Sequence, residues 1–222
     1  MKIYCMSDIH GYILEMEEAL KNFEINLENN DTVLLLLGDY IHGPNTKAVL
    51  DKIIFLQNKY GEDKVIPLIG NHEEMVLDGR WDLDISDINA CERDKYISLI
   101  HNMQRYYVHN RTIFVHAGID EEAQDLWEWG TDEYTFTEKY PAQLGHFYKD
   151  YCIVAGHIGT SEICGDRDYH DIYYDGQSHY YIDGTVRESG RIPVLMVDTD
   201  ANKYYRVTDT GNWIILPYDE EN

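Results

Sequence analysis

The sequence predicts an α/β protein built on a mainly parallel sheet. Residues Val33–Leu37 form an unbroken apolar run that ends at Gly38-Asp39. A short apolar run of this kind is typical of a strand that is buried on both faces of a parallel sheet. Segments with apolar residues at helical spacing follow this strand and the one before it. Strands and helices that alternate in this way indicate parallel strands joined by crossover helices.

The first third of the chain contains three such units in series. Each begins with a short apolar segment, and a polar loop leads from it into the next helix. The expected strands are 2–6, 33–37 and 64–69, and the expected helices are 12–23 and 46–59. Units of this kind bring the carboxyl ends of the strands to one edge of the sheet, where ligands bind in open α/β folds.

The rest of the chain continues with further helices and short strands. Helices are expected over 74–83 and 86–103, and residues 80–105 are expected to form a cap beside the site. Strands are expected at 106–109, 112–115 and 152–155. Residues 169–216 carry alternating aromatic and polar residues, with turns at Asp175-Gly176 and Asp183-Gly184. This pattern indicates an addition of antiparallel strands.

Length and composition indicate one folded domain over residues 1–222. Hydrophobic residues make up 44% of the chain, and no apolar run approaches the roughly 18 residues that cross a bilayer. The N-terminus lacks the apolar segment of a signal peptide, and the four cysteines form no CxxC pair, so a reduced, cytoplasmic protein is expected. The formal net charge of −23 disfavours binding to a nucleic acid polymer or to an anionic membrane.

Polar residues follow five of the expected strands at the point where each one ends. They are Asp8 and His10, Asp39, Asn71 and His72, His116, and His157. A single histidine at a strand end is more often a surface residue than a ligand. The joint pattern of carboxylate, imidazole and amide is instead the ligand set of borderline divalent metals. The sequence therefore predicts a metal site at this edge of the sheet.

The same residues belong to an ordered set of motifs. DxH, GD, GNHE, HAG and GH occur in this order at residues 8–10, 38–39, 70–73, 116–118 and 156–157. In these motifs the chain resembles the metallophosphoesterases, and within them the phosphoprotein-phosphatase type, which includes bacterial serine/threonine phosphatases and diadenosine tetraphosphatases. The resemblance covers nearly the whole chain. It implies the calcineurin-like fold, a four-layer α/β/β/α sandwich with two mixed sheets, and a dinuclear metal site.

The resemblance also implies a role for each motif residue. Asp8 and His10 would bind one metal, Asn71, His116 and His157 would bind the other, and Asp39 would bridge the two. The implied cofactor is a pair of divalent ions, with Mn²⁺ favoured and iron or zinc also compatible with a mixed oxygen and nitrogen set. Two cations about 3.5–4 Å apart need a shared anion, and together they deprotonate a bridging water near neutral pH. That hydroxide would attack phosphorus in line.

The reaction implied by the resemblance is hydrolysis of a phosphate ester. His72 would be the general acid that protonates the leaving oxygen, while Glu73 would support the site through hydrogen bonds. The expected substrate is a phosphomonoester of the phosphoserine or phosphothreonine type, carried by a phosphoprotein or a small molecule. A dinucleoside polyphosphate is the alternative substrate.

The chain departs from the family pattern at its second motif. That motif usually reads GDxxDRG, in which the later aspartate orients the catalytic histidine and the arginine binds phosphate. Here His42 replaces the aspartate and Gly43 replaces the arginine. A second phosphate-binding arginine is also missing, because no arginine occurs between Arg111 and Arg167. His42 would then be either a protonated phosphate contact, a neutral hydrogen-bond partner of His72, or a plain structural residue.

Three consequences of these departures are open at the level of sequence. The enzyme could take a less charged or bulkier ester and hold it through His42, Tyr40 or Arg80. It could be a slow phosphomonoesterase with broad specificity. It could also bind a phosphorylated ligand or partner with little turnover. The reason is that no other side chain binds a phosphoryl group through two parallel hydrogen bonds as a planar guanidinium does.

A separate hypothesis concerns a nucleotide substrate. Residues 80–105 and 120–150 could form a lid that selects a nucleotide by stacking on Trp81, Trp127 or Trp129. Tryptophans in such positions are more often core or edge anchors than stacking platforms.

Overall fold

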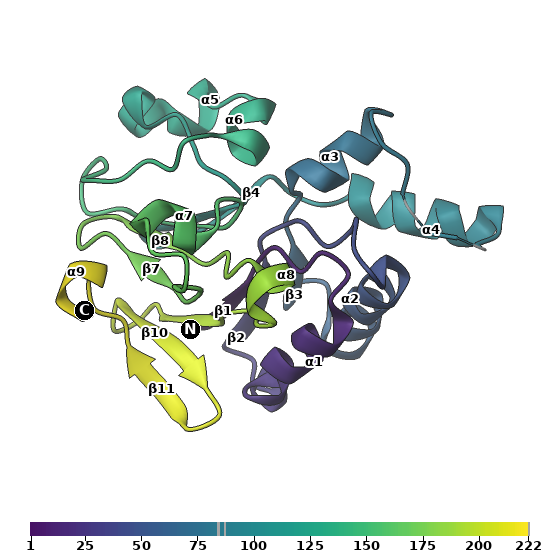
Figure 1. The fold of residues 1–222 in the computed structure, drawn as a ribbon, viewed down its shortest axis with the longest axis horizontal. Coiled ribbons are helices and arrows are strands. Elements are labelled where there is room, and N and C mark those ends of the chain that lie inside the picture. Colours follow the sequence, from purple (N-terminus) through teal and green to yellow (C-terminus); the bar gives the residue numbers. More distant parts are fainter. Residues whose placement is uncertain (84, 87, 222) are drawn as a thin grey trace.

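The computed structural model describes residues 1–83, 85–86 and 88–221, and it contains two mixed sheets with helices against them (Figure 1). The strands of the first sheet, in spatial order, are β11 (Gly211–Ile214), β10 (Lys203–Thr208), β9 (Leu195–Asp198), β1 (Lys2–Met6), β2 (Thr32–Leu36) and β3 (Val65–Pro67). Those of the second are β4 (Tyr106–His109), β5 (Thr112–Val115), β6 (Cys152–Ala155), β8 (His179–Tyr181) and β7 (Tyr173–Tyr174).

The helices are mostly short and connect strands of the two sheets. They are α1 (Ile13–Lys21), α2 (Thr46–Tyr60), α3 (Asn71–Leu77), α4 (Ala90–His101), α5 (Trp127–Gly130), α6 (Glu133–Glu138), α7 (Thr160–Cys164), α8 (Val186–Ser189) and α9 (Tyr218–Glu221). Two 3₁₀ segments cover Glu24–Glu28 and Glu121–Leu126. No helix in the described ranges is both long enough and apolar enough to traverse a lipid bilayer.

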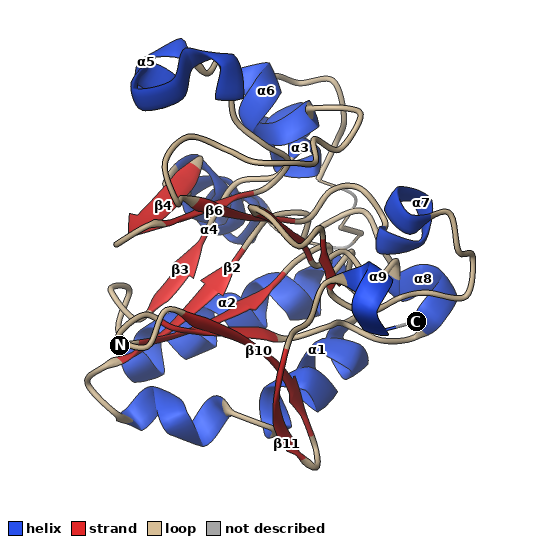
Figure 2. Cartoon of the chain, turned by 90° about the vertical axis from the view of Figure 1, so that its left-hand side faces the viewer, coloured by secondary structure: helices blue, strands red, loops and turns tan. Residues whose placement is uncertain are grey.

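The side chains of the strands alternate between separate layers of the core. In β1, Tyr4 and Met6 pack with α1 and α2, whereas Ile3 and Cys5 pack with residues of the second sheet such as Phe114. This period of two is the geometry of a pleated strand buried on both faces. A third cluster covers the outer face of the second sheet. Helices α1 and α2 accordingly lie on the far side of the first sheet, and α5 and α6 lie beyond the second (Figure 2).

The predicted parallel sheet is present in the N-terminal part of the chain. Strands β1, β2 and β3 run parallel, with Tyr4 paired to Leu34 and Leu35 paired to Ile66. The fold is therefore α/β, and the sheet becomes mixed because β9, β10 and β11 add antiparallel strands at its other side. The carboxyl ends of β1, β2 and β3 meet at one edge, as the sequence analysis predicts.

The antiparallel strands predicted for residues 169–216 are present in β9 to β11 and in the hairpin of β7 with β8 around Asp175-Gly176, but β8 also has a parallel neighbour. Strands β9 to β11 are antiparallel, but β8 pairs parallel to β6, with Val154 opposite Tyr180. A crossover through α7 joins β6 to β8, so β8 has the same direction as β6 and is buried along its length. Asp183-Gly184 is therefore not a hairpin turn between antiparallel strands, because these residues follow the carboxyl end of β8 and lead into α8.

The cap predicted over residues 80–105 is only partly at the site. Residues 84 and 87 of this range lie outside the described residues. Helix α4 packs on α2, where Tyr96 is fully buried and its hydroxyl donates to Asp51 Oδ1 at 2.8 Å. Lys95 Nζ donates to the same carboxylate oxygen at 2.8 Å. The part of this range that reaches the site is the segment around Trp81 and Asp82.

Candidate metal centre

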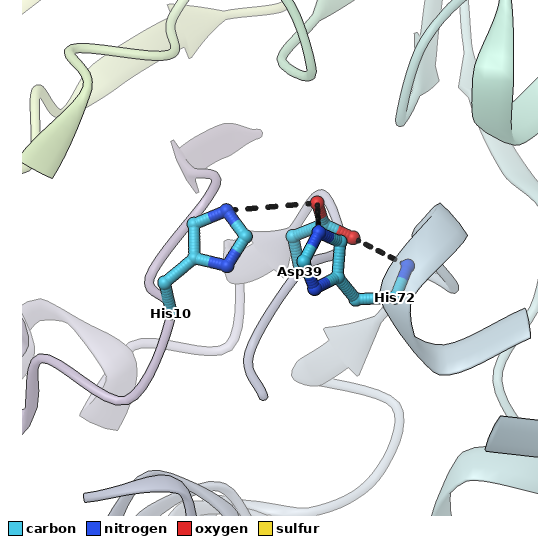
Figure 3. A group of neighbouring side chains, drawn as sticks. All are labelled: His10, Asp39 and His72. Carbon is cyan, nitrogen blue, oxygen red and sulfur yellow. Dashed lines mark hydrogen bonds and ion pairs between the residues drawn. The ribbon is translucent and has the colours of Figure 1, made fainter. Parts of the chain in front are cut away.

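The strand ends that the sequence analysis singles out converge on Asp39. His10 Nε2 lies 3.6 Å from Asp39 Oδ2, and His116 Nε2 lies 3.5 Å from Asp39 Oδ1. His72 Nε2 lies 3.8 Å from Asp39 Oδ2, and its backbone N–H donates to Asp39 Oδ1 at 3.0 Å. Figure 3 shows His10 and His72 reaching the Asp39 carboxylate from different segments of the chain. Asp39 is 2% exposed, so this convergence occurs largely out of water.

Asn71 faces the same carboxylate from the first turn of α3. One polar atom of its amide lies 3.0 and 3.2 Å from the two Asp39 oxygens, 3.1 Å from His116 Nε2 and 3.3 Å from His157 Nδ1. All of these neighbours present lone pairs. The structure places the Asn71 amide oxygen here, 3.1 Å from His116 Nε2, which is the orientation in which Asn71 would bind a cation among these groups.

Asp8 joins the centre from the end of β1. Its Oδ2 accepts a hydrogen bond from the His157 backbone N–H at 3.0 Å, and its Oδ1 lies 4.0 Å from His10 Nε2. The first and the fifth strand ends in the predicted set are thus tied directly to one another. The six residues expected to be metal ligands, Asp8, His10, Asp39, Asn71, His116 and His157, lie in one cluster.

The backbone at the centre adopts left-handed conformations. Of the ten non-glycine residues with positive φ in the described part of the chain, five lie at the centre, with φ between 43° and 66°, and they are Asp8, His10, Asp39, His42 and His157. A non-glycine residue in this region costs on the order of 1–3 kcal/mol and persists only where the surrounding structure fixes it. Each sharp turn redirects a side chain from the strand axis toward the centre, which explains why the strain is concentrated at these positions.

Glu73 fixes the loop that carries Asp39. Its fully buried carboxylate accepts hydrogen bonds from the backbone N–H groups of Asp39 at 2.8 Å, Tyr40 at 2.9 Å and Gly70 at 3.1 Å. Gly70 lies so close that a Cβ at this position would come within 2.2 Å of Asp39 Oδ1. The GNHE motif therefore combines a close approach at glycine with a carboxylate anchor, which agrees with the supporting role expected for Glu73.

Two histidines are oriented by backbone carbonyls. His116 Nδ1 lies 2.7 Å from Leu37 O, and His10 Nδ1 lies 3.2 Å from Ile41 O. A carbonyl only accepts, so Nδ1 carries a proton in both rings, and Nε2 is the nitrogen that would bind a cation beside Asp39. This arrangement is the usual one for metal-binding histidine, in which a hydrogen bond at the second nitrogen fixes ring orientation.

The electrostatics of the centre suit a cation. Burial together with the Asp39 charge raises the pKa of Asp8 to about 7, and burial raises the pKa of Asp39 to about 6. Burial together with neighbouring histidines lowers the pKa of His157 to about 3, and burial lowers that of His116 to about 4. These two rings are neutral at pH 7, the form that binds metals. Burial lowers the pKa of His10, but the charges of Asp39 and Asp8 outweigh it and raise that pKa.

The donor set fits divalent metal ions on geometric grounds. Two overlapping groups, His10 with Asp39 and His72, and Asp39 with His116 and His157, each have ligand atoms within 4.8 Å of one another. Ligands about 2.0–2.3 Å from one ion lie up to about 4.6 Å apart, so small movements would complete either group. Asp39 belongs to both groups, as a bridging carboxylate would. The first group also includes His72, for which the sequence analysis expects a different role.

His42 makes a hydrogen bond to His72. The Nδ1 atoms of the two rings are 2.8 Å apart, and His42 Nε2 lies 2.9 Å from the backbone oxygen of Asp82. Trp81 packs edge-on against both rings, with centroid distances of 4.8 Å to His42 and 5.4 Å to His72. Of the roles that the sequence leaves open for His42, this geometry matches the hydrogen-bond partner of His72.

Other residues expected to contact substrate are placed differently. Tyr40 is wrong as a substrate contact, because it is fully buried and its hydroxyl donates to the backbone oxygens of Leu36 and Leu68, each at 2.7 Å. The guanidinium of Arg80 is bound by two carboxylates, Asp78 at 2.6 Å and Glu138 at 3.0 Å.

The three tryptophans of the lid hypothesis lie in different environments. Trp127 is buried in the cluster outside the second sheet, where its ring lies 5.0 Å from Tyr106, so the stacking role expected for it is wrong. Trp129 is 89% exposed on α5. Trp81, which is 52% exposed, is the one of the three that packs on His42 and His72.

A cavity of about 480 Å³ opens beside His10 and His72. Its walls include three residues that the sequence analysis does not assign to the site, namely Asp183, Thr185 and Arg187. Burial and the charge of Asp8 raise the pKa of Asp183 to about 7. The signal for Asp183 is present in the sequence, because Tyr180-Tyr181-Ile182 is a further apolar run that ends in Asp-Gly.

Comparisons with known proteins agree with this arrangement. The family model described as calcineurin-like phosphoesterase matches residues 1–195. No curated protein sequence matches the chain.

Solved structures provide three informative matches. A cold-active protein-tyrosine phosphatase is 17% identical, with a TM-score of 0.69 over 97% of this chain and 79% of the other. A candidate diadenosine tetraphosphatase is 15% identical, with a TM-score of 0.66 over 93% and 92% of the two chains. A protein serine/threonine phosphatase from Saccharomyces cerevisiae is 13% identical, with a TM-score of 0.62 over 97% and 79%. At these identities the structures establish a shared fold.

Proposed function

The chain belongs to the calcineurin-like phosphoesterase family, whose members hydrolyse phosphoesters with divalent metals, and on that basis we propose that it hydrolyses phosphomonoesters of the phosphoserine or phosphothreonine type. The observation that carries the proposal is the convergence of four strand ends on the buried carboxylate of Asp39, which itself follows β2. Two divalent ions, for which we propose Mn²⁺, would be held by Asp8, His10, Asp39, Asn71, His116 and His157.

The ions would lower the pKa of a coordinated water and neutralise the oxygens of the phosphoryl group. The remaining roles, proton donation and positioning of the loop, would fall to side chains of the protein. His72 would act as the general acid in its doubly protonated form, with Nδ1–H donated to His42 at 2.8 Å and the Nε2 proton available to the leaving oxygen. Burial and the neighbouring histidines lower the pKa of His72 to about 3, so the ring would gain this proton only when an anionic substrate binds. The hydrogen bonds that the Glu73 carboxylate accepts from the Asp39 loop hold this loop in place, so a bridging Asp39 carboxylate would need no rearrangement during the reaction.

The test is steady-state hydrolysis by metal-stripped protein after addition of manganese, zinc, magnesium or no metal. The substrates are an aryl phosphate, a phosphoserine peptide, a phosphodiester and diadenosine tetraphosphate. We expect manganese to restore hydrolysis, with the monoesters preferred. If none of the four is hydrolysed by protein that holds two metals per chain, the proposal is wrong and a role in binding phosphorylated ligands replaces it.

Trp81 favours a dinucleoside polyphosphate as the second candidate substrate. Its ring is half exposed and lies against His42 and His72, next to the proposed reaction site. Stacking of a base on an aromatic ring contributes about 1–3 kcal/mol, so a Trp81→Ala variant should raise KM for diadenosine tetraphosphate about tenfold. Trp129→Ala, at an exposed position on α5, is the matched control. Equal KM values in both variants would remove this candidate.

A further inference from the structure

We propose that Arg187 binds the phosphoryl group and makes the site selective for dianionic phosphomonoesters, an inference that rests on the function proposed above. The two family positions for a phosphate-binding arginine hold no arginine here, since Gly43 occupies the first and the segment between Arg111 and Arg167 contains none. Arg187, which comes from a different part of the chain, lines the cavity that also contains His10 and His72. Its position therefore brings a guanidinium to the mouth of the metal centre.

The backbone that carries Arg187 is fixed by the site itself. Asp183 Oδ1 accepts a hydrogen bond from Thr185 N–H at 2.7 Å, and the backbone oxygen of Asp183 accepts one from Thr160 N–H at 2.9 Å. Thr185 has a φ of 48°, a left-handed conformation that turns the chain from β8 into α8. This turn directs α8 toward the cavity, so Arg187 is attached to a well-anchored segment although its own side chain is exposed.

Arg187 also differs from most arginines of the chain in its charge environment. Within the described residues, Arg80, Arg93, Arg105, Arg111 and Arg206 each form an ion pair with at least one carboxylate. Arg187 forms none there. Arg167 and Arg191 form none either, but neither of them lines this cavity. In a protein with a formal net charge of −23, an arginine left unpaired beside the metal centre is available to an anionic ligand.

The remaining walls of the cavity suit the rest of such a substrate. Tyr12, Pro44 and Val186 provide an apolar surface beside Arg187. A volume of about 480 Å³ exceeds that of a phosphate ion and lies at the lower end of the range for small-molecule sites. A single phosphoryl group with one modest leaving group fits this description. A guanidinium favours the dianion of a monoester over the monoanion of a diester, because it offers both charge and a planar fork.

The test compares Arg187→Gln and Arg187→Lys with the control Arg191→Gln, which changes an exposed arginine outside the cavity. The first readout is the Kd of inorganic phosphate for the manganese-loaded protein, measured by calorimetry. The second is kcat/KM for 4-nitrophenyl phosphate and for bis(4-nitrophenyl) phosphate. Loss of a charge-assisted hydrogen bond should raise the phosphate Kd of Arg187→Gln about tenfold or more. Its kcat/KM should fall similarly for the monoester and less than about threefold for the diester.

The outcomes separate the two proposals. Arg187→Lys should lie between the wild type and Arg187→Gln, because it retains the charge and loses the fork. A phosphate Kd in Arg187→Gln equal to that in Arg191→Gln overturns the role of Arg187, whether or not the wild type is active. If the wild type hydrolyses no ester but its phosphate Kd depends on Arg187, the proposed hydrolysis fails and the binding role stands.

Discussion

His42 and His72 are joined by a hydrogen bond between their Nδ1 atoms, which lie 2.8 Å apart. The backbone oxygen of Asp82 accepts from His42 Nε2 at 2.9 Å, so the proton of a neutral His42 ring is on Nε2 and its Nδ1 is an acceptor. His72 must then donate from its own Nδ1, which leaves its Nε2 facing Asp39. A histidine that forms a hydrogen bond with His72 thus occupies the position where the resembled family has an orienting aspartate.

The first prediction concerns this pair. His42→Leu removes the acceptor and should lower kcat about 10- to 100-fold, because the His72 ring loses the contact that fixes its orientation. His42→Asn retains a side-chain acceptor and should keep most of the activity. Steady-state kinetics with an aryl phosphate would measure both. Equal losses in the two variants would show that the hydrogen bond does not orient His72.

The second prediction concerns proton donation by His72. His72→Asn should reduce kcat by about 10²–10⁴-fold if the ring protonates the leaving oxygen. The loss should be smaller for esters with very acidic leaving groups, which need no proton. His101→Asn, at an exposed position in the last turn of α4, is the control.

The metal content of His72→Asn decides between the two roles open to this ring. Two metals per chain with low turnover would support the acid, and the loss of one metal would make His72 a ligand instead. Wild-type turnover at every pH would remove His72 from the mechanism altogether.

The third prediction concerns the anchor of the Asp39 loop. Glu73→Ala removes a carboxylate that accepts three backbone hydrogen bonds, so the loop should lose its fixed geometry and metal affinity should fall about 10- to 100-fold. Competition with a metal-sensitive dye would measure this affinity. Glu74→Ala is the matched control, since Glu74 pairs with Arg105 instead of the loop. Equal affinities in the two variants would contradict the anchoring role.

The fourth prediction concerns pH and a buried ion network far from the metal centre. His179 Nδ1 lies 2.9 Å from Asp175 Oδ2, and its Nε2 lies 2.9 Å from Glu121 Oε1. Burial lowers the pKa of His179, but hydrogen bonds to Asp175 and Glu121 outweigh it and raise the pKa to about 9. A pKa raised from 6.5 to about 9 corresponds to roughly 3 kcal/mol of stability, fully present below pH 6.5 and lost as pH rises through 9.

Chemical denaturation of His179→Gln at two pH values would measure this contribution. The difference in the free energy of unfolding from the wild type should be large at pH 6 and much smaller at pH 10. A difference that is the same at both pH values would mean that neutral packing, and not the charge of His179, stabilises this part of the second sheet.

The clustering of the six candidate ligands can be predicted from sequence because each one lies just after an apolar strand. Parallel strands end at the same edge, so residues as distant as Asp8 and His157 could be expected together before any contact was known. Asp183 follows the same rule, but the sequence predicts a hairpin turn there because the tyrosines of β8 resemble an alternating antiparallel strand. Periodicity does not report strand direction, and the short crossover through α7 gave little helical signal.

Substrate contacts were less predictable than ligands. Tyr40 is adjacent to Asp39, but the left-handed turn at Asp39 sends the next side chain into the core. Arg187 belongs to no motif of the sequence, and only the packing of α8 brings it to the cavity. Side-chain direction after a sharp turn depends on tertiary structure, which a linear pattern does not contain.

The left-handed backbone at the centre has a consequence for how this protein would change over generations. At Asp8, His10, Asp39, His42 and His157, glycine would relieve conformational strain that the present residues impose. Selection for folding alone would favour such replacements, while selection for the reaction opposes them. A lineage released from its catalytic task should therefore lose these five residues early and become more thermostable as it does so.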